Sequence, residues 1–163
     1  MSDPRQPVPG GAHRVFGTKK PVIYHDRHGA YVLPVREGLF GVVRIPKGLF
    51  LIGGGIEPGE SEEECISREC AEETGWSVRI DSFLCSAETF TVHSEMGPFH
   101  PMQSYYLGTL LAPDRKRVET DHTLLWMRPE DLFGRMFSEM QNWAVEEAFR
   151  RIREGVAFPS GTA

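Results

Sequence analysis

The chain has 163 residues, of which 40% are hydrophobic and 25% charged, and its formal net charge is −5. That length is sufficient for one domain with a full core, and no apolar run approaches the ~20 residues of a membrane-spanning helix. Eight Glu and one Arg give residues 57–73 a net charge of −7, so the rest of the chain carries only +2, which excludes a basic surface for a nucleic-acid polymer.

The three cysteines, Cys65, Cys70 and Cys85, show no paired CxxC spacing. The N-terminus lacks the long apolar segment of a secretory signal. Reduced thiols in a cytoplasmic protein are therefore the simplest expectation, with no membrane partner. The sequence leaves a homodimer open.

The first 13 residues combine Pro and Gly with little apolar content, which predicts a disordered tail before a domain at residues 14–155. Polar segments at residues 25–29 and 94–101 predict a turn and a mobile loop. Apolar runs bounded by turn residues predict strands. They lie at residues 21–24, 30–35, 39–45, 49–52, 78–84, 87–93, 102–111 and 123–127.

Two helices are predicted near the C-terminus. Pro129 suits a first helical position, and apolar residues recur at helical spacing from Ser138 to Glu154. Gly155 closes that second helix, and residues 156–163 are expected to fray. Strands before, between and after helices predict an α/β fold with a mixed sheet.

A further helix is predicted in the acidic middle of the chain. Ser61 and Glu64 form a capping box, in which each side chain satisfies a backbone N–H at the helix start. Gly75 is placed to end the helix in a left-handed conformation. Three glycines in a row, at residues 53–55, precede this helix. Backbone without side chains can approach a phosphate closely or offer a carbonyl oxygen to a metal.

The helix places three carboxylates on one face, because Glu69, Glu72 and Glu73 are three and four residues apart. Hard oxygen ligands of this kind suit Mg²⁺ or Mn²⁺. Arg68 lies four residues before Glu72 and can orient it. A solvated acidic helix face is the alternative, but it leaves the preceding glycines and Glu60 unexplained.

The spacing of these residues resembles the Nudix box, G-x5-E-x7-R-E-U-x-E-E-x-G-U, in which U is aliphatic. All seven fixed positions match, and the two aliphatic positions depart as Cys70 and Trp76. The fixed positions are Gly54, Glu60, Arg68, Glu69, Glu72, Glu73 and Gly75. The Leu-Pro-Gly-Gly that often precedes the box in this family is Leu-Ile-Gly-Gly here, which predicts only a local backbone difference.

The resemblance implies an α/β/α sandwich with a central mixed sheet and a loop-helix-loop catalytic motif. It also implies hydrolysis of the diphosphate bond in a nucleoside diphosphate linked to another moiety, such as a nucleoside triphosphate or a nucleotide sugar. Glu69, Glu72, Glu73 and the Gly53 carbonyl match the family's metal ligands. Arg68 matches the arginine that orients the helix carboxylates, and Glu60 the glutamate that steadies the loop.

Residues outside the box complete the expected site, although each can equally be structural. Any of the three helix glutamates can be the general base, and a base or extra ligand from outside the box is expected among Glu119, His122, Glu88 or Glu95. Cations just before the box can contact phosphates, namely Arg36, Arg44 and Lys47. Aromatic side chains can stack on a base, namely Tyr31, Phe50, Phe90 and Tyr105.

Two alternatives remain open for the function. One is a catalytically silent nucleotide-binding or sensor module that keeps the fold, which loss of a box glutamate would have favoured. The other is a prenyl-diphosphate isomerase, which shares the fold but needs catalytic features that are not evident here. The submotifs that mark particular substrates are also not evident after Gly75, so the substrate stays open.

Overall fold

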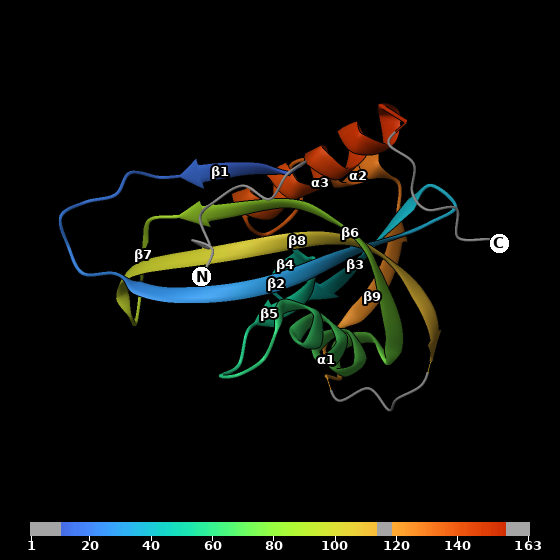
Figure 1. Ribbon diagram of the computed structural model, residues 1–163, viewed down its shortest axis with the longest axis horizontal. Helices are drawn as coiled ribbons and strands as arrows, with labels where there is room; N and C mark the ends of the chain where they lie inside the picture. Colours follow the sequence, from blue (N-terminus) through green and yellow to red (C-terminus); the bar gives the residue numbers. More distant parts are fainter. Residues whose placement is uncertain (1–10, 114–118, 156–163) are drawn as a thin grey trace.

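The computed structural model describes residues 11–113 and 119–155, and in these residues a nine-stranded mixed sheet lies between helices (Figure 1). The main path runs β1-β6-β8-β2-β3-β4, while β5 pairs with β2, β7 with β8 and β9 with β3. The β1–β6 and β2–β8 pairs are parallel and the others antiparallel. The strands are β1 (Ala12–Phe16), β2 (His25–Arg36), β3 (Leu39–Ile45), β4 (Gly48–Phe50), β5 (Ile52–Gly55), β6 (Trp76–Thr89), β7 (Thr91–His93), β8 (Gly97–Pro113) and β9 (Thr123–Met127).

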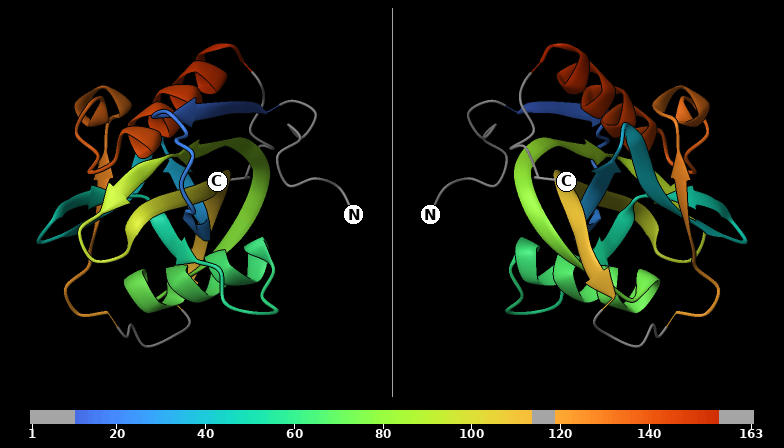
Figure 2. Two further views of the ribbon diagram at one scale, coloured as in Figure 1. Left: turned by 90° about the vertical axis from the view of Figure 1, so that its left-hand side faces the viewer. Right: turned by 90° about the vertical axis from the view of Figure 1, so that its right-hand side faces the viewer.

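Helices cover both faces of the sheet, which confirms the α/β/α sandwich (Figure 2). Helix α1 (Glu62–Thr74) packs on one face, and α2 (Pro129–Leu132) and α3 (Glu139–Arg153) lie over the other. Neighbouring strand residues point to opposite faces. Val32 therefore joins the core cluster with Ile66 of α1, whereas Leu33 joins the cluster with Ala144 of α3.

Both long helices begin and end where local signals predict. The Ser61 hydroxyl accepts a hydrogen bond from the Glu64 N–H at 3.1 Å, and Gly75 ends α1 with φ 76°. The Ser138 hydroxyl caps α3 in the same way, accepting from the Gln141 N–H at 3.1 Å. Because these caps are local, the sequence alone locates them.

The N-terminal half of β2 was predicted wrongly. Residues 21–24 are not a strand, and the predicted turn at residues 25–29 is the first part of β2. Parallel pairing with β8, from His25 opposite Phe99 onwards, satisfies this polar backbone. Similarly, part of the predicted loop at residues 94–101 belongs to β8, and β6 spans the gap predicted between residues 84 and 87.

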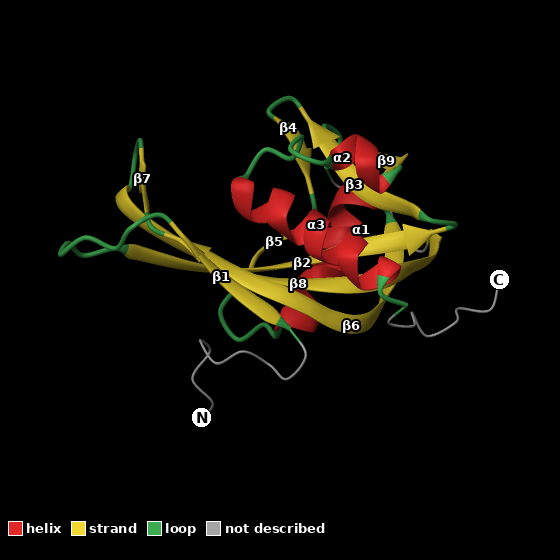
Figure 3. Cartoon of the chain, turned by 90° about the horizontal axis from the view of Figure 1, so that it is seen from above, coloured by secondary structure: helices red, strands yellow, loops and turns green. Residues whose placement is uncertain are grey.

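The predicted N-terminal tail is also shorter than expected, because Ala12 and His13 belong to β1, which pairs with β6. The rest of that tail, residues 1–10, and the predicted frayed end, residues 156–163, lie outside the described residues. Seen from above, the strands around β7 extend beyond the helices (Figure 3). In the described part of the chain, no helix has both the length and the apolar character needed to cross a membrane.

Candidate functional site

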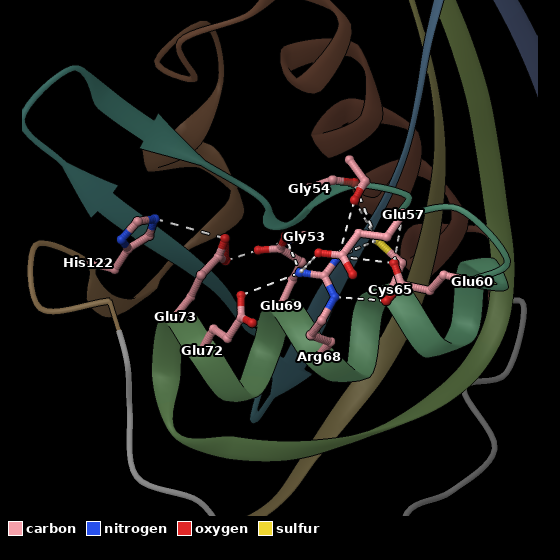
Figure 4. A network of polar contacts seen from close by, with 11 residues as sticks. Gly53, Gly54, Glu57, Glu60, Cys65, Arg68, Glu69, Glu72, Glu73 and His122 are labelled. Atoms are coloured by element: carbon pink, nitrogen blue, oxygen red, sulfur yellow. Dashed lines mark hydrogen bonds and ion pairs between the residues drawn. The ribbon is translucent and has the colours of Figure 1, made fainter.

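The glycines of β5 let α1 carboxylates approach the sheet edge closely. A Cβ on Gly54 would lie 2.7 Å from Glu69 Oε1, and a Cβ on Gly53 only 2.2 Å from the Ala30 carbonyl oxygen. Gly53 also has φ 149°, which side chains rarely adopt. Its N–H donates to Glu73 Oε2 at 3.3 Å (Figure 4). Glycine at these positions is thus required by contact with Glu69 and the neighbouring strand.

Arg68 lies at the centre of the acidic group (Figure 4). Its Nε and Nη2 donate to the two oxygens of Glu60 at 2.7 and 3.0 Å. Its Nη1 donates to Glu69 at 2.9 Å and to Glu72 at 3.4 Å. The same guanidinium donates to the Gly55 carbonyl at 3.2 Å, so it fixes the loop and the helix carboxylates together.

The Arg68–Glu60 pair is a bidentate, charge-assisted contact. Hydrogen bonding to Arg68 lowers the pKa of Glu60 to about 2. Glu60 Oε1 also accepts from the Glu57 N–H at 3.1 Å, within the loop before α1. Glu60 is thus an ionised anchor for the loop, in the position that the sequence predicts for it.

Glu73 is nearly buried, at 5% exposure, and faces other acids. Burial first, and then the Glu69 charge, raise the pKa of Glu73 to about 9. Burial also raises the pKa of Glu69. A divalent cation would offset both the burial and the repulsion, so the residues fit a site for Mg²⁺ or Mn²⁺.

The structure brings two predicted residues from outside the box to this acidic group. The Glu119 N–H donates to the Glu72 carbonyl at 2.8 Å, and the His122 Nε2 lies 3.9 Å from Glu73 Oε1. The Nδ1 of His122 is 2.8 Å from Asp121 Oδ1. One ligand atom each from Glu119, Asp121 and His122 lie within 4.8 Å of one another, a spacing at which the three side chains could hold one ion together.

The two other predicted bases lie elsewhere. Glu88 is buried and sits between the imidazoles of His13, at 2.9 Å, and His100, at 3.3 Å. Glu95 is exposed in the turn between β7 and β8, where its N–H donates to His93 Nδ1 at 3.1 Å. Of the four candidates, Glu119 and His122 are therefore the ones placed beside the box.

Two pockets meet at Arg27. The larger, of about 780 Å³, is lined by Glu60, Arg68 and Glu69, and we name it the acidic groove. The smaller, of about 490 Å³, we name the aromatic pocket. Its lining comprises Arg27, Gly29, Tyr31, Phe50, Thr89, Thr91, Phe99, Pro101, Gln103, Phe137, Ser138, Glu139, Met140 and Gln141.

Sequence reasoning missed Arg27, which lines both pockets. Its guanidinium lies over Gly55, since a Cβ there would be 2.8 Å from Arg27 Nη2. Arg27 lies in a segment that the sequence predicts as a turn, so nothing in the sequence indicated that it belongs to β2 and lies near the site. Phe137 and Gln141 were missed as well, because they reach the pocket from the loop before α3 and from its first turn.

The predicted aromatic contacts divide into two groups. Tyr31 and Phe50 line the aromatic pocket. Phe90 instead stacks on His100 at 4.2 Å, and Tyr105 is fully buried in the core. Tyr31 and Phe50 therefore remain the better placed of the four for contact with a substrate.

The predicted phosphate-binding cations do not line either pocket. Arg36 lies over the rings of Trp76 and Trp126, at 5.3 and 4.7 Å from their centroids. Arg44 and Lys47 are exposed on β3 and in the turn after it. A role for these three cations in phosphate binding stays a prediction.

Comparison with known proteins identifies the family. The model of the NUDIX domain matches residues 21–151, so this chain belongs to the Nudix family. The MutT NUDIX hydrolase from Burkholderia pseudomallei is 25% identical, with TM-score 0.62, covering 76% of this chain and 98% of that one. A NUDIX hydrolase from Nitrosomonas europaea is 18% identical, with TM-score 0.65 and coverage of 77% and 90%.

A curated relative matches more locally. The NAD-capped RNA hydrolase NudC of Stutzerimonas stutzeri (strain A1501) is 34% identical over 68 residues. The match covers 42% of this chain and 24% of that protein, so the chain spans only about a quarter of that relative.

Proposed function

We propose that this chain is a metal-dependent hydrolase that cleaves the diphosphate bond of a small-molecule nucleoside diphosphate derivative. The observation that carries the proposal is the convergence of Glu69, Glu72, Glu73 and Glu119 at one sheet edge. A nearly buried acid among like charges must either keep a proton or bind a cation, and a cation lets Glu73 ionise at neutral pH. Arg27 lines the adjoining groove and can neutralise part of the charge of an incoming phosphate, whereas the donors of Arg68 are already taken by carboxylates and the Gly55 carbonyl.

Each residue has a separate part in this proposal. Glu69, Glu72, Glu73 and the Gly53 carbonyl would hold Mg²⁺ or Mn²⁺. When bound, such an ion lowers the pKa of a water and screens phosphate charge. Arg68, itself anchored on Glu60, would hold the carboxylates of Glu69 and Glu72 in place, and Glu69 lines the groove.

A proton acceptor is available beside the box. His122 is held by Asp121 and faces Glu73, and Glu119 is tied to the end of α1 through its backbone. Either side chain can take the proton from the attacking water. Glu119→Gln and His122→Asn separate the two, because only the variant of the true base changes the pH profile of turnover as well as its rate.

The test is a panel of nucleoside triphosphates, nucleotide sugars and NAD, assayed for phosphate-containing products with Mg²⁺ and with Mn²⁺. NAD belongs in the panel because the curated relative is named as a NAD-capped RNA hydrolase. We expect turnover of at least one compound, dependent on the metal. Tight binding of a nucleotide with no turnover of any would indicate a sensor module instead.

Conservative substitution of the helix carboxylates provides the matching control. Glu72→Gln or Glu73→Gln should lower turnover by at least ~100-fold, because metal position contributes that much to catalysis. Glu64→Gln changes a carboxylate in the first turn of the same helix, outside both the acidic group and the groove lining. If Glu73→Gln behaves like Glu64→Gln, Glu73 has no part in the mechanism.

A further inference from the structure

The aromatic pocket has the size and walls of a site for a flat ring. Its volume of about 490 Å³ falls in the range of small-molecule sites. Phe50 and Phe137 stack on each other at 5.0 Å with an interplanar angle of 24°. Phe137 is 60% exposed although it is a large apolar side chain, and its N–H is tied to the Leu49 carbonyl at 2.9 Å. An exposed, anchored ring beside a pocket is suited to stacking on a ligand.

Gln141 gives this pocket a polar group of fixed orientation. The side chain is only 2% exposed, and its Oε1 accepts from the Leu51 backbone N–H at 2.8 Å. A backbone N–H can only donate, so the amide oxygen must face Leu51. Among residues 11–113 and 119–155, no acceptor is found for the Gln141 NH₂ group, and no buried side-chain nitrogen lacks a partner. The NH₂ group therefore reaches open space, which for this residue is the pocket that it lines.

A second amide, that of Gln103, lines the same pocket. Tyr105 is buried, which raises the pKa of its hydroxyl well above the ordinary value and keeps the proton in place. That hydroxyl donates to Gln103 Oε1 at 2.6 Å. In this arrangement the Gln103 NH₂ group is a second donor, but only Gln141 has its orientation fixed by a backbone N–H.

We infer that the aromatic pocket takes the nucleobase of the substrate and that Gln141 selects a base with a carbonyl oxygen on its edge. Such a base, as in inosine, guanosine or uridine, offers an acceptor where adenosine and cytidine carry an amino group. The assignment concerns the same site as the hydrolysis proposed above and rests on it. Arg27 joins the pocket to the acidic groove, which lets a base and its diphosphate lie in the two spaces at once.

The test compares nucleotides that differ at one group. Inosine and adenosine 5′-monophosphates, and the uridine and cytidine pair, are titrated by calorimetry, which needs no turnover. We expect the carbonyl member of each pair to bind about tenfold more tightly, from one additional hydrogen bond. Gln141→Glu keeps an acceptor for the Leu51 N–H but loses the NH₂ donor. Because burial raises the pKa of a carboxyl, as it does for Glu73, the titrations are repeated across pH, and at the highest pH the substitution should abolish or reverse the preference.

Phe137 gives a second test, because substitution of an exposed side chain leaves the folded structure intact. Phe137→Ala should raise KM about tenfold for the compound turned over fastest in the panel, with a smaller effect on kcat. Phe133→Ala is the control, because Phe133 is 36% exposed, packs on Phe149 and lies outside the pocket lining. Equal effects of the two substitutions would overturn the assignment of the pocket.

The outcomes of the two proposals differ. Turnover with no carbonyl preference in the wild type, or with a preference that survives Gln141→Glu, leaves hydrolysis standing and rejects the base site. A carbonyl preference in binding without any turnover leaves the base site standing and rejects hydrolysis.

Discussion

At the scale of single residues, the cluster of acidic side chains around Arg68 contains two carboxyls, of Glu60 and Glu73, whose pKa values shift in opposite directions. Glu60 is ionised by its bidentate contact with Arg68, whereas burial beside Glu69 disfavours the charge of Glu73. The difference follows from their surroundings, since both are glutamates of the same motif. Glu60 contributes to stability as an anion, while Glu73 is suited to bind a cation.

Glu60 should contribute stability that disappears in acid. Its folded pKa, about 2, lies below the ordinary value of 4.5 for a glutamate, so the stabilisation is present above pH 4.5 and is lost as pH falls toward 2. We therefore expect Glu60→Gln to lower the Tm at pH 7 and to have progressively less effect in acid. Thermal unfolding followed by circular dichroism across this pH range measures the difference. A Tm difference that is constant with pH would contradict the role of Glu60 as an ionised anchor.

Glu73 should act in the opposite direction when no metal is added. Its folded pKa, about 9, lies above 4.5, so the folded state loses stability as pH rises from 4.5 to 9. Glu73→Gln removes this loss, and at pH 8 the variant should be more stable than the wild type, on the order of a few kcal/mol. Urea denaturation in the presence of a chelator measures it. A wild type that is more stable than Glu73→Gln at pH 8 would contradict the raised pKa of Glu73.

At the scale of elements, strand β5 and the loop between it and α1 depend on glycine for different reasons. Gly53 combines φ 149° with a backbone oxygen 2.2 Å from the position of a Cβ. Gly59 has φ 78° but open space around it. Gly59→Ala thus measures the cost of a left-handed backbone alone, and Gly53→Ala measures the larger cost of φ 149° together with a clash against β2.

We expect Gly59→Ala to cost about 1 kcal/mol and Gly53→Ala at least ~3 kcal/mol in the free energy of unfolding. Urea denaturation of both variants gives the comparison. Gly54→Ala differs again, because its Cβ would meet the flexible end of Glu69 at 2.7 Å. That variant should keep most of its stability and lose turnover. Similar stabilities for Gly53→Ala and Gly59→Ala would show that the β2 contact is not rigid.

The elements also show which features a sequence can predict. The strands β3 and β9, and both ends of α1, match their predictions because apolar runs and caps are local signals. The first half of β2 was missed, since its pairing with β8 joins residues about 75 positions apart. For the same reason the box residues could be predicted and the aromatic pocket could not. Its lining comes from strands and loops spread over most of the chain.

At the scale of the whole molecule, a bound cation should stabilise the fold, because only the folded chain brings Glu69, Glu73 and Glu119 together. A ligand present at 100 times its Kd adds about 2.7 kcal/mol. For a domain of this size that corresponds to a rise in Tm of about 5–10 °C. Differential scanning fluorimetry with Mn²⁺ or Mg²⁺ measures the shift without any substrate.

The same shift should increase with pH, because a proton on Glu73 competes with the cation. We expect a larger rise in Tm at pH 8.5 than at pH 6, and almost none at either pH in Glu73→Gln. Ca²⁺ serves as a control for nonspecific screening, since its larger radius favours more ligands at longer distances. A rise that is equal in wild type and Glu73→Gln would place the cation elsewhere on the molecule. The acidic face of α1 would then be a solvated surface, and the hydrolytic role proposed for it would lose its physical basis.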